Sequence, residues 1–291
     1  MKPLFFGGIR MNLAACAALL VSCAGAQCDE GDSDARDPQD TVVLERFADK
    51  GRAFAPIYAD PREAQFKLGY LHEFGGKSFF DFTIGGDADL AYWSGPGSRR
   101  TSLSGRGLIS SRFELNSDSF DLQNTDFQGG LALGTACGDR SYEAYLFHQS
   151  SHLGDELVGS GSRSKIDYIQ NSARLLASQK WGHLRGYCGL TVNFFNEPDE
   201  YDNRFQFQVG AEKRFLEGTR PMYLAVDIQA KEGLDWHPNA IIEFGVELGN
   251  LKTTKNRQRL YIQLFTGYSN MGQFYNERES YLLFGVAYNA V

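Results

Sequence analysis

Residues 239–249 read N-A-I-I-E-F-G-V-E-L-G, and apolar and polar side chains alternate along them. Glu243 and Glu247 share one face with small glycines, and Ile241 is the apolar exception on that face. The opposite face carries Ala240, Ile242, Phe244, Val246 and Leu248. Alternation with a period of two over this length predicts a β-strand with one apolar and one polar side.

The same alternation recurs from Gln65 to the end of the chain, between turns rich in Gly, Asn, Asp and Ser. An even number of such strands in an exported chain is typical of an outer-membrane barrel. We therefore predict an all-β fold, an antiparallel transmembrane β-barrel of about 12 strands over residues 57–291. The predicted strands begin near Gln65, Lys77, Gly107, Asp126, Tyr142, Ile166, His183, Arg204, Met222, Asn239, Gln258 and Glu279.

A soluble β-sandwich is the alternative fold, because its sheets also alternate between an inward apolar face and a wet face. Strands in soluble proteins are usually about five or six residues long, so the longer segments here favour the barrel. Short connections that alternate with longer ones favour it too. Two connections fit that rule poorly: Gly75-Gly76 is short and residues 250–257 are long.

The composition excludes some classes of function. The chain has 291 residues, and 29 Lys and Arg against 36 Asp and Glu give it a net charge of −7. Nucleic-acid binding needs a basic surface that neutralises phosphates, so no nucleic-acid partner is expected. A hydrophobic content of 42% is too high for a disordered chain. The five cysteines form no CxxC pair and have no metal-ligand spacing.

The N-terminus predicts export. Lys2 and Arg10 precede the apolar run 13–21. This run is too short to span a bilayer but suits a signal peptide. Cleavage at the A-x-A site would remove residues 1–26, whereas a lipobox that ends at Cys23 would attach a lipid there. Residues 27–56 are predicted to form an acidic linker with a short amphipathic turn. We expect a bacterial outer-membrane protein whose partners are membrane lipid, the barrel-assembly machinery and a second copy in a homodimer.

One predicted strand carries polar side chains on the face that should meet lipid. Along residues 142–151 the apolar face ends with His148 and Ser150, and Asn171 interrupts the apolar face of the next strand. Pairing His148 with Asn171 centres the connecting loop between Gly159 and Ser160, in a Gly-Ser-Gly segment that suits a turn. Directly opposed residues have Cβ atoms about 5 Å apart, so the three side chains are predicted to form one cluster.

These three residue types suit nucleophilic catalysis. Ser150 would be the nucleophile, His148 the general base, and Asn171 the group that orients the imidazole. Placement at i and i+2 on one strand face lets the base reach the hydroxyl. Polar side chains near a strand end are also ordinary at the headgroup level of a membrane. A non-catalytic structural barrel or narrow pore is therefore the alternative function.

His148-Gln149-Ser150 resembles the H-Q-S-N-G motif of outer-membrane phospholipase A, a twelve-stranded barrel. In that family the His and Ser, with an Asn from the following strand, face lipid and hydrolyse acyl esters with calcium. The resemblance implies a phospholipase A-like acyl hydrolase with calcium as cofactor. This chain has Ser151 and His152 where that family has Asn and Gly. A similarity to lipid A deacylases, which combine His-x-Ser with a Glu, is weaker.

Two carboxylates follow this motif in the predicted loop. Asp155 and Glu156 supply the oxygen ligands that calcium prefers, so they are the candidate metal ligands. A solvated loop without a metal is the alternative interpretation of the same two residues.

A longer resemblance is to a bacterial family catalogued as domain of unknown function 1207. It covers roughly Phe54 to the C-terminus and implies an exported, barrel-like protein without an assigned activity. Three segments resemble its motifs: A-D-P-R-E at 59–63, F-H-Q-S-S-H-L-G-D-E at 147–156 and G-Q-F-Y at 272–275.

Charged residues on the inward face of the predicted strands bear on the lumen. A barrel of this size is narrow, so these side chains are expected to fill the lumen rather than line a channel. They are Arg204, Arg214, Asp227, Lys231, Glu243 and Glu247.

Overall fold

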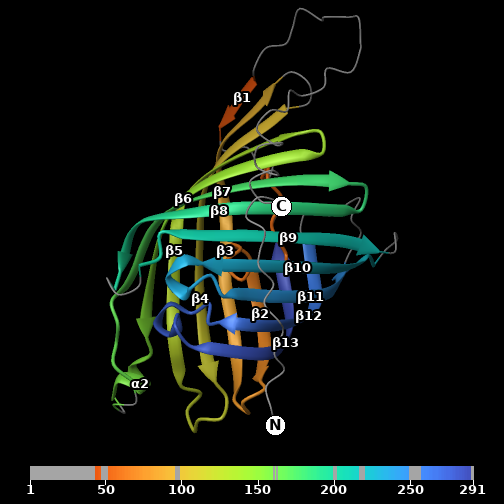
Figure 1. Ribbon diagram of the computed structural model, residues 1–291. Coiled ribbons are helices and arrows are strands. Elements are labelled where there is room, and N and C mark those ends of the chain that lie inside the picture. Colours follow the sequence, from red (N-terminus) through yellow and green to blue (C-terminus); the bar gives the residue numbers. More distant parts are fainter. Residues whose placement is uncertain are drawn as a thin grey trace, which may run out of the picture.

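The strands close into a barrel, as the sequence predicts. The computed structural model describes residues 43–46, 52–95, 99–159, 161, 163–198, 202–215, 220–248 and 257–289. Twelve strands, β2 to β13, each pair antiparallel with their neighbours in the chain, and β13 pairs with β2 (Figure 1). This closed sheet excludes the β-sandwich. In the described part of the chain, no helix is long and apolar enough to cross a membrane.

The barrel strands differ in length, and β3 to β5 are the longest. They are β2 (Phe66–Glu73), β3 (Ser78–Gly95), β4 (Arg99–Glu114), β5 (Leu122–Cys137), β6 (Arg140–Leu153), β7 (Tyr168–Trp181), β8 (Leu184–Glu197), β9 (Phe205–Phe215), β10 (Met222–Lys231), β11 (Pro238–Leu248), β12 (Arg257–Tyr268) and β13 (Arg278–Asn289). A short helix, α2 (Asp155–Gly159), follows β6, and 3-10 turns η1 (Glu232–Leu234) and η2 (Gly272–Phe274) follow β10 and β12.

The predicted strand starts are within two residues of the observed ones except for β4 and β5, which begin earlier. The start predicted near Gly107 is wrong because residues 99–106 read R-R-T-S-L-S-G-R and show no apolar alternation. They are nevertheless strand, since they pair with both β3 and β5. The edge of β3 that pairs with β2 at residues 78–83 pairs with a further strand, β1 (Val43–Arg46), at residues 91–94. This strand occupies part of the segment predicted as a linker with an amphipathic turn.

The two ends of the barrel differ. Connections 74–77, 115–121, 154–167, 198–204, 232–237 and 269–277 lie at one end, which we call the long-loop end. The opposite end, which we call the turn end, carries the short connections 138–139 and 182–183. Connection 74–77 is short and 249–256 is long, so the two exceptions noted in the sequence remain.

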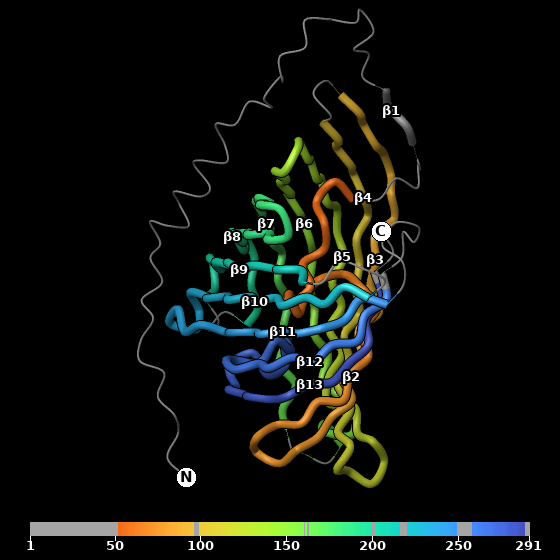
Figure 2. Tube along the Cα trace, turned by 90° about the vertical axis from the view of Figure 1, so that its right-hand side faces the viewer, coloured from red at the N-terminus to blue at the C-terminus, as the bar shows by residue number. Residues whose placement is uncertain are grey.

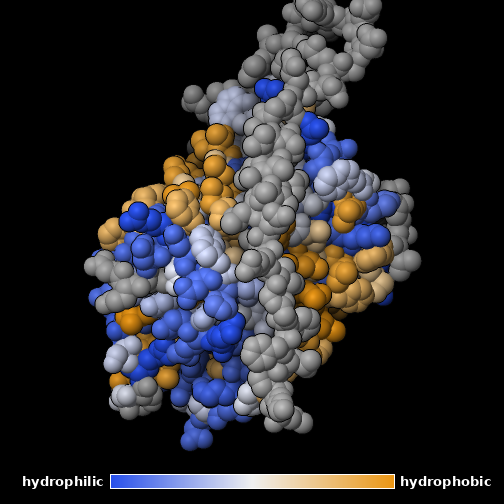
Figure 3. Space-filling model, viewed as in Figure 1, coloured by the Kyte–Doolittle hydropathy of each residue, from blue (hydrophilic) through white to orange (hydrophobic). Residues whose placement is uncertain are grey.

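Side chains alternate between the outside and the inside of the wall. Apolar side chains such as Leu146, Ile242 and Phe284 are exposed outward, while Glu143, Glu243 and other polar side chains are buried inside. Figure 3 shows apolar groups at the upper left and lower right, and polar ones gathered at the lower left over the long-loop end. An apolar outer belt around a polar interior is the pattern of a barrel that crosses a membrane.

Residues 52–65, which we call the lumen segment, fill the inside of the barrel. Figure 2 shows this segment in orange, between the wall of β3 to β5 and that of β8 to β10. Phe54, Ile57 and Ala59 are fully buried within it. Interior packing therefore includes residues 52–56, which precede residue 57, where the sequence pattern predicts the barrel domain to begin.

Charged groups join the lumen segment to the wall. Arg52 forms ion pairs with Glu63 and with Glu143 of β6. The Tyr58 hydroxyl donates to Glu247 at 2.6 Å, and Arg174 donates to Asp60 at 2.8 Å. Because each buried charge has an opposite charge or a hydrogen-bond partner, the segment can occupy the interior without leaving isolated ions. Of the six charges predicted to fill the lumen, Asp227, Glu243 and Glu247 are buried inside it. Arg204 is not among them: it precedes β9, and its side chain is 71% exposed beside Asp202.

Some predictions fall on other parts of the chain. The predicted signal peptide, Cys23 and residues 27–42 of the linker lie outside the described residues. Cys137, at the turn end of β5, is disulfide-bonded.

Candidate functional site

The hairpin of β6 and β7 has the register predicted from its sequence. His148 lies opposite Asn171, and the pairs Leu146–Ala173 and Ala144–Leu175 follow. The outward face of β6 stays apolar up to Leu146 because those side chains belong to the outer belt. Polar side chains replace them only from His148 onward, over the last residues of β6 before the long-loop end. His148 and Asn171 therefore lie side by side on the outside of the barrel.

A hydrogen bond joins these two side chains. His148 Nδ1 lies 2.8 Å from Asn171 Oδ1. An amide oxygen only accepts, so Nδ1 is the donor, and in the neutral imidazole the lone pair then lies on Nε2. This is the tautomer that a general base needs.

Ser150 lies two residues from His148 on the same outward face, between Phe127 of β5 and Ile169 of β7. Its side chain is half-buried, whereas His148 is exposed. Among the hydrogen bonds of the described residues, none joins Ser150 to His148. A hydrogen bond between a catalytic base and its nucleophile is often formed only when substrate binds.

His152 is a residue of this cluster that the sequence reasoning missed. The predicted strand ends at residue 151, but β6 continues to Leu153, so His152 follows Ser150 on the outward face. Its ring meets the edge of Phe127 at a centroid distance of 5.7 Å. Ser150 thus lies between two imidazoles, and the alternation of His148, Ser150 and His152 in the sequence was the available signal.

A second histidine–serine pair occurs on the opposite side of the long β3–β5 wall. His72 Nδ1 lies 2.9 Å from Ser78 Oγ, and the Tyr70 hydroxyl lies 3.0 Å from the same oxygen. Ser78 is buried, and its hydroxyl already has two partners. No carboxylate or amide side chain holds His72 among the described residues, so this pair lacks the orienting group that Asn171 provides for His148.

The predicted metal ligands are not gathered into a site. Asp155 and Glu156 begin α2, and both are exposed. Among the described residues, no three His, Cys, Asp or Glu side chains are close enough to hold one ion. Calcium requires six to eight oxygens, so this donor set does not fit a preformed calcium site.

Ser151 points inward and belongs to a different cluster. Its hydroxyl donates to Asp126, and the backbone N–H of Gly272 donates to the same carboxylate at 3.0 Å. The side chain of Gln273 donates to the Ser151 carbonyl at 2.8 Å, and Arg62 pairs with Asp126. The three motif segments noted in the sequence thus meet at one buried carboxylate. This cluster fastens the lumen segment and the β12–β13 connection to the wall.

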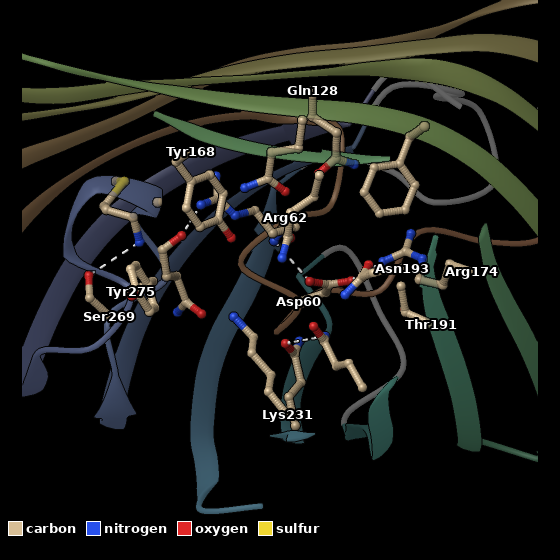
Figure 4. Close-up of a pocket in the computed structure, with 18 residues that line it drawn as sticks. Asp60, Arg62, Gln128, Tyr168, Arg174, Thr191, Asn193, Lys231, Ser269 and Tyr275 are labelled. Atoms are coloured by element: carbon tan, nitrogen blue, oxygen red, sulfur yellow. Dashed lines mark hydrogen bonds and ion pairs between the residues drawn. The ribbon is translucent and has the colours of Figure 1, made fainter. Parts of the chain in front are cut away.

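A polar cavity of about 40 Å³ lies beside this cluster in the lumen, large enough for a few water molecules. Figure 4 shows Arg62 and Lys231 on opposite sides of it, with Asp60 between Arg62 and Arg174. Asp60 accepts from the Arg62 backbone N–H at 2.8 Å and from Arg174. The cavity lies between part of the lumen segment and the wall, and it is too small for a lipid.

Comparison with known protein families finds a match over most of the chain. Residues 31–290 match a family described as protein of unknown function DUF1207. The chain belongs to the DUF1207 family. No curated protein matches it significantly.

Among the solved structures similar to this DUF1207 chain are outer-membrane phospholipases. Outer membrane phospholipase A from Escherichia coli has a TM-score of 0.52 and 17% identity, over 77% of this chain and 91% of the enzyme. An active-site mutant of that enzyme, in which an asparagine is replaced by alanine, has a TM-score of 0.52 and 19% identity, over 80% and 92%. The Salmonella typhi enzyme, a dimer with bound calcium, has a TM-score of 0.50 and 17% identity, over 80% and 93%. At these identities the likeness is one of fold, an outer-membrane-type barrel.

Proposed function

We propose that this DUF1207 protein is a lipid acyl hydrolase of the bacterial outer membrane, in which Ser150 is the nucleophile, His148 the general base and Asn171 the orienting residue. The observation that carries the proposal is the 2.8 Å hydrogen bond between His148 and Asn171 on the outward face. Polar side chains on the lipid face of a barrel cost free energy. A catalytic role gives a reason for that cost.

The proposed reaction uses these residues in two steps. Ser150 Oγ attacks the carbonyl carbon of an acyl ester, and its proton passes to Nε2 of His148. The bond to the alcohol oxygen then breaks, and His148 gives the proton to that oxygen. A water molecule, deprotonated by His148, attacks the acyl-serine, which releases the fatty acid and restores Ser150.

We propose that His152 stabilises the negative charge that develops on the oxygen of the tetrahedral intermediate. It follows Ser150 on the same face, and an N–H of its ring could donate to the developing oxyanion. Its edge contact with Phe127 limits the directions that the ring can take. Loss of one oxyanion donor typically lowers kcat about 100-fold, so His152→Ala should retain measurable activity.

The surroundings of the site support a lipid substrate. The apolar belt on both sides of the site would place Ser150 at the edge of the hydrocarbon layer, where ester bonds of membrane lipids lie. The fold likeness to outer membrane phospholipase A supports the outer membrane as the location, and with it our proposal that the barrel-assembly machinery is a partner. The asparagine replaced in the active-site mutant supports a role for Asn171. The Salmonella typhi dimer supports a homodimer as a working form.

A non-catalytic barrel is the competing function. The lumen segment argues against its narrow-pore version, because buried ion pairs join the segment to β6 and β7, and the Tyr58–Glu247 hydrogen bond joins it to β11.

Acyl-chain release by the refolded full chain in phospholipid–detergent micelles tests the proposal. We expect Ser150→Ala to lower the rate at least about 1000-fold, as for other nucleophile deletions. Ser78→Ala, in the other histidine–serine pair, should stay within twofold of wild type. Equal rates for wild type and Ser150→Ala, or no release by folded wild type, would leave the structural barrel as the function. A heat-dependent gel shift verifies that each variant is folded.

Calcium enters the same assay as a separate arm. Because the described donors do not fit a calcium site, no step is derived through the ion. We expect the double variant Asp155→Asn, Glu156→Gln to release acyl chains at the wild-type rate in calcium. Loss of activity in this variant, with rescue at higher calcium, would instead identify these carboxylates as ligands.

A further inference from the structure

A groove of about 540 Å³ crosses the outer wall of the barrel next to His148. It runs over β3, β4 and β5 and ends against β6, where His148 forms part of its lining. Ile84, Ile109 and Phe127 form its wall on the side of the long-loop end, and each of them is exposed. Leu131 and Leu146 stand in the next outward row towards the turn end, 53% and 57% exposed. No charged side chain lines the groove among the described residues.

The floor of the groove is a row of directly paired residues. Gly86 lies opposite Gly107, Gly107 opposite Gly129, and Gly129 opposite His148. The row continues from His148 to Asn171. The groove therefore leads along one line across the wall to the imidazole of the proposed site.

Packing and backbone conformation do not require these glycines. A Cβ at Gly86 would meet no atom within 4 Å, and at Gly107 and Gly129 the nearest atoms are carbonyl oxygens at 3.5 and 3.9 Å. None of the three has a positive φ among the described residues. Glycine weakens a strand interior, and often marks a place where another molecule approaches the backbone. The absence of side chains here serves to keep the groove open.

The groove also runs obliquely across the wall, so that its far end lies further from the long-loop end than the site does. Asn171 is three residues from the long-loop end of β7, and His148 is five from that end of β6. Gly107 is seven residues from the end of β4, and Gly86 is eight from the end of β3. A molecule with its ester at Ser150 would thus extend from the headgroup level towards the centre of the bilayer.

We propose that this groove binds the acyl chain whose ester bond Ser150 attacks. The proposal rests on the proposed function for the position of the ester, and it goes further in naming the residues that select the chain. The groove is part of the apolar belt that faces hydrocarbon, and its lining is uncharged, so a lipid tail fits it better than a polar partner. Three strand spacings give it a length of about 14 Å. An extended alkyl chain advances roughly 1.25 Å per carbon, so about eleven carbons fill it.

Two measurements on the refolded full chain test the groove. The first is kcat/KM for p-nitrophenyl esters with acyl chains from short to long, for wild type, Gly107→Leu and Ala144→Leu. Gly107→Leu fills the middle of the floor, whereas Ala144→Leu adds the same side chain to an exposed, outward position of β6 outside the groove. We expect Gly107→Leu to lose at least tenfold on chains of about twelve carbons and to keep the wild-type value on butyrate. Ala144→Leu should match wild type throughout.

The second measurement does not depend on hydrolysis. A phospholipid with a photoreactive diazirine near the end of its acyl chain is bound to Ser150→Ala protein and irradiated, and labelled peptides are mapped. We expect label on β3 to β5 around the groove, its loss in Ser150→Ala with Gly107→Leu, and its retention in Ser150→Ala with Ala144→Leu.

The outcomes separate the two proposals. Label in the groove without hydrolysis by wild type would support the groove and overturn the proposed function. Hydrolysis with an unchanged chain-length profile in Gly107→Leu, and label spread evenly over the wall, would overturn the groove alone. A change from dimer to monomer in Gly107→Leu, with unchanged labelling, would show that a second copy occupies the groove and would also overturn it.

Discussion

A break in the ladder between β7 and β8 lies directly beside Asn171. Asn171 pairs with Phe195 and Ser172 with Asn193, so Phe194 is an extra residue on β8. A bulge of this kind turns the neighbouring side chains and is common beside functional sites. Phe194 is 65% exposed, so it adds apolar surface beside the His148–Asn171 pair. The bulge therefore helps to set the direction from which Asn171 meets the imidazole.

The role of Asn171 can be tested by separating kcat from KM. Asn171→Ala removes the acceptor that holds His148 Nδ1. We expect kcat for acyl release to fall about 10- to 100-fold with little change in KM, because the base is misplaced while the substrate surface is intact. Asn171→Asp keeps an oxygen acceptor and should recover most of the rate. A fall in Asn171→Ala that appears only in KM would contradict the orienting role.

At the scale of elements, Glu63 holds two parts of the lumen segment together. It pairs with Arg52 and accepts the Ile57 backbone N–H at 2.9 Å. Glu63→Gln leaves Arg52 short of one buried partner, which typically costs about 3–5 kcal/mol. We expect faster proteolytic cleavage within residues 52–65, measured on the folded barrel by mass spectrometry.

A matched exposed pair provides the control for that measurement. Glu277 pairs with Arg163, but its side chain is 50% exposed. Glu277→Gln should leave the cleavage rate at the wild-type value, because exposed ion pairs contribute little. Equal cleavage of the Glu63 and Glu277 variants would show that the lumen segment is held by packing alone.

Acid should weaken the same element. Burial alone would raise the pKa of Glu63, but the guanidinium groups of Arg52, Arg106 and Arg174 lower it from 4.5 to about 2. A carboxylate with a lowered folded-state pKa stabilises the fold fully above its unfolded pKa, and this contribution is lost as the pH falls. We expect pepsin to cleave the lumen segment increasingly from pH 4.5 to about pH 2. Glu63→Gln should show a flatter dependence; an equally steep one would assign the acid response to other carboxylates.

At the scale of the whole molecule, closure between β2 and β13 joins the two ends of the described sheet. Closed barrels have no edge strand at which unfolding can begin, so they tend to resist detergent. We expect unheated protein in SDS to migrate ahead of boiled protein on a gel. Migration that does not change on boiling would mean that the sample is not a closed barrel under those conditions.

Local patterns were enough to predict much of this protein. Period-two alternation is a property of each strand alone, so residues 239–249 and their relatives indicated the strands and the barrel. The face on which His148, Ser150 and Asn171 lie follows from the same parity, and the turn between them determined the register. The start of β4 was missed because its first residues are polar and carry no alternation.

Other features depend on residues far apart in the chain. Arg62, Asp126 and Gly272 meet only after closure, so their motifs had no visible connection in the sequence. The row from Gly86 to His148 needs the registers of four strands at once. The sequence by itself thus determined the strands, their faces and the catalytic candidates, because these are local. Only the tertiary structure decided what fills the lumen and what borders the site, because those contacts are set by the ring of strands as a whole.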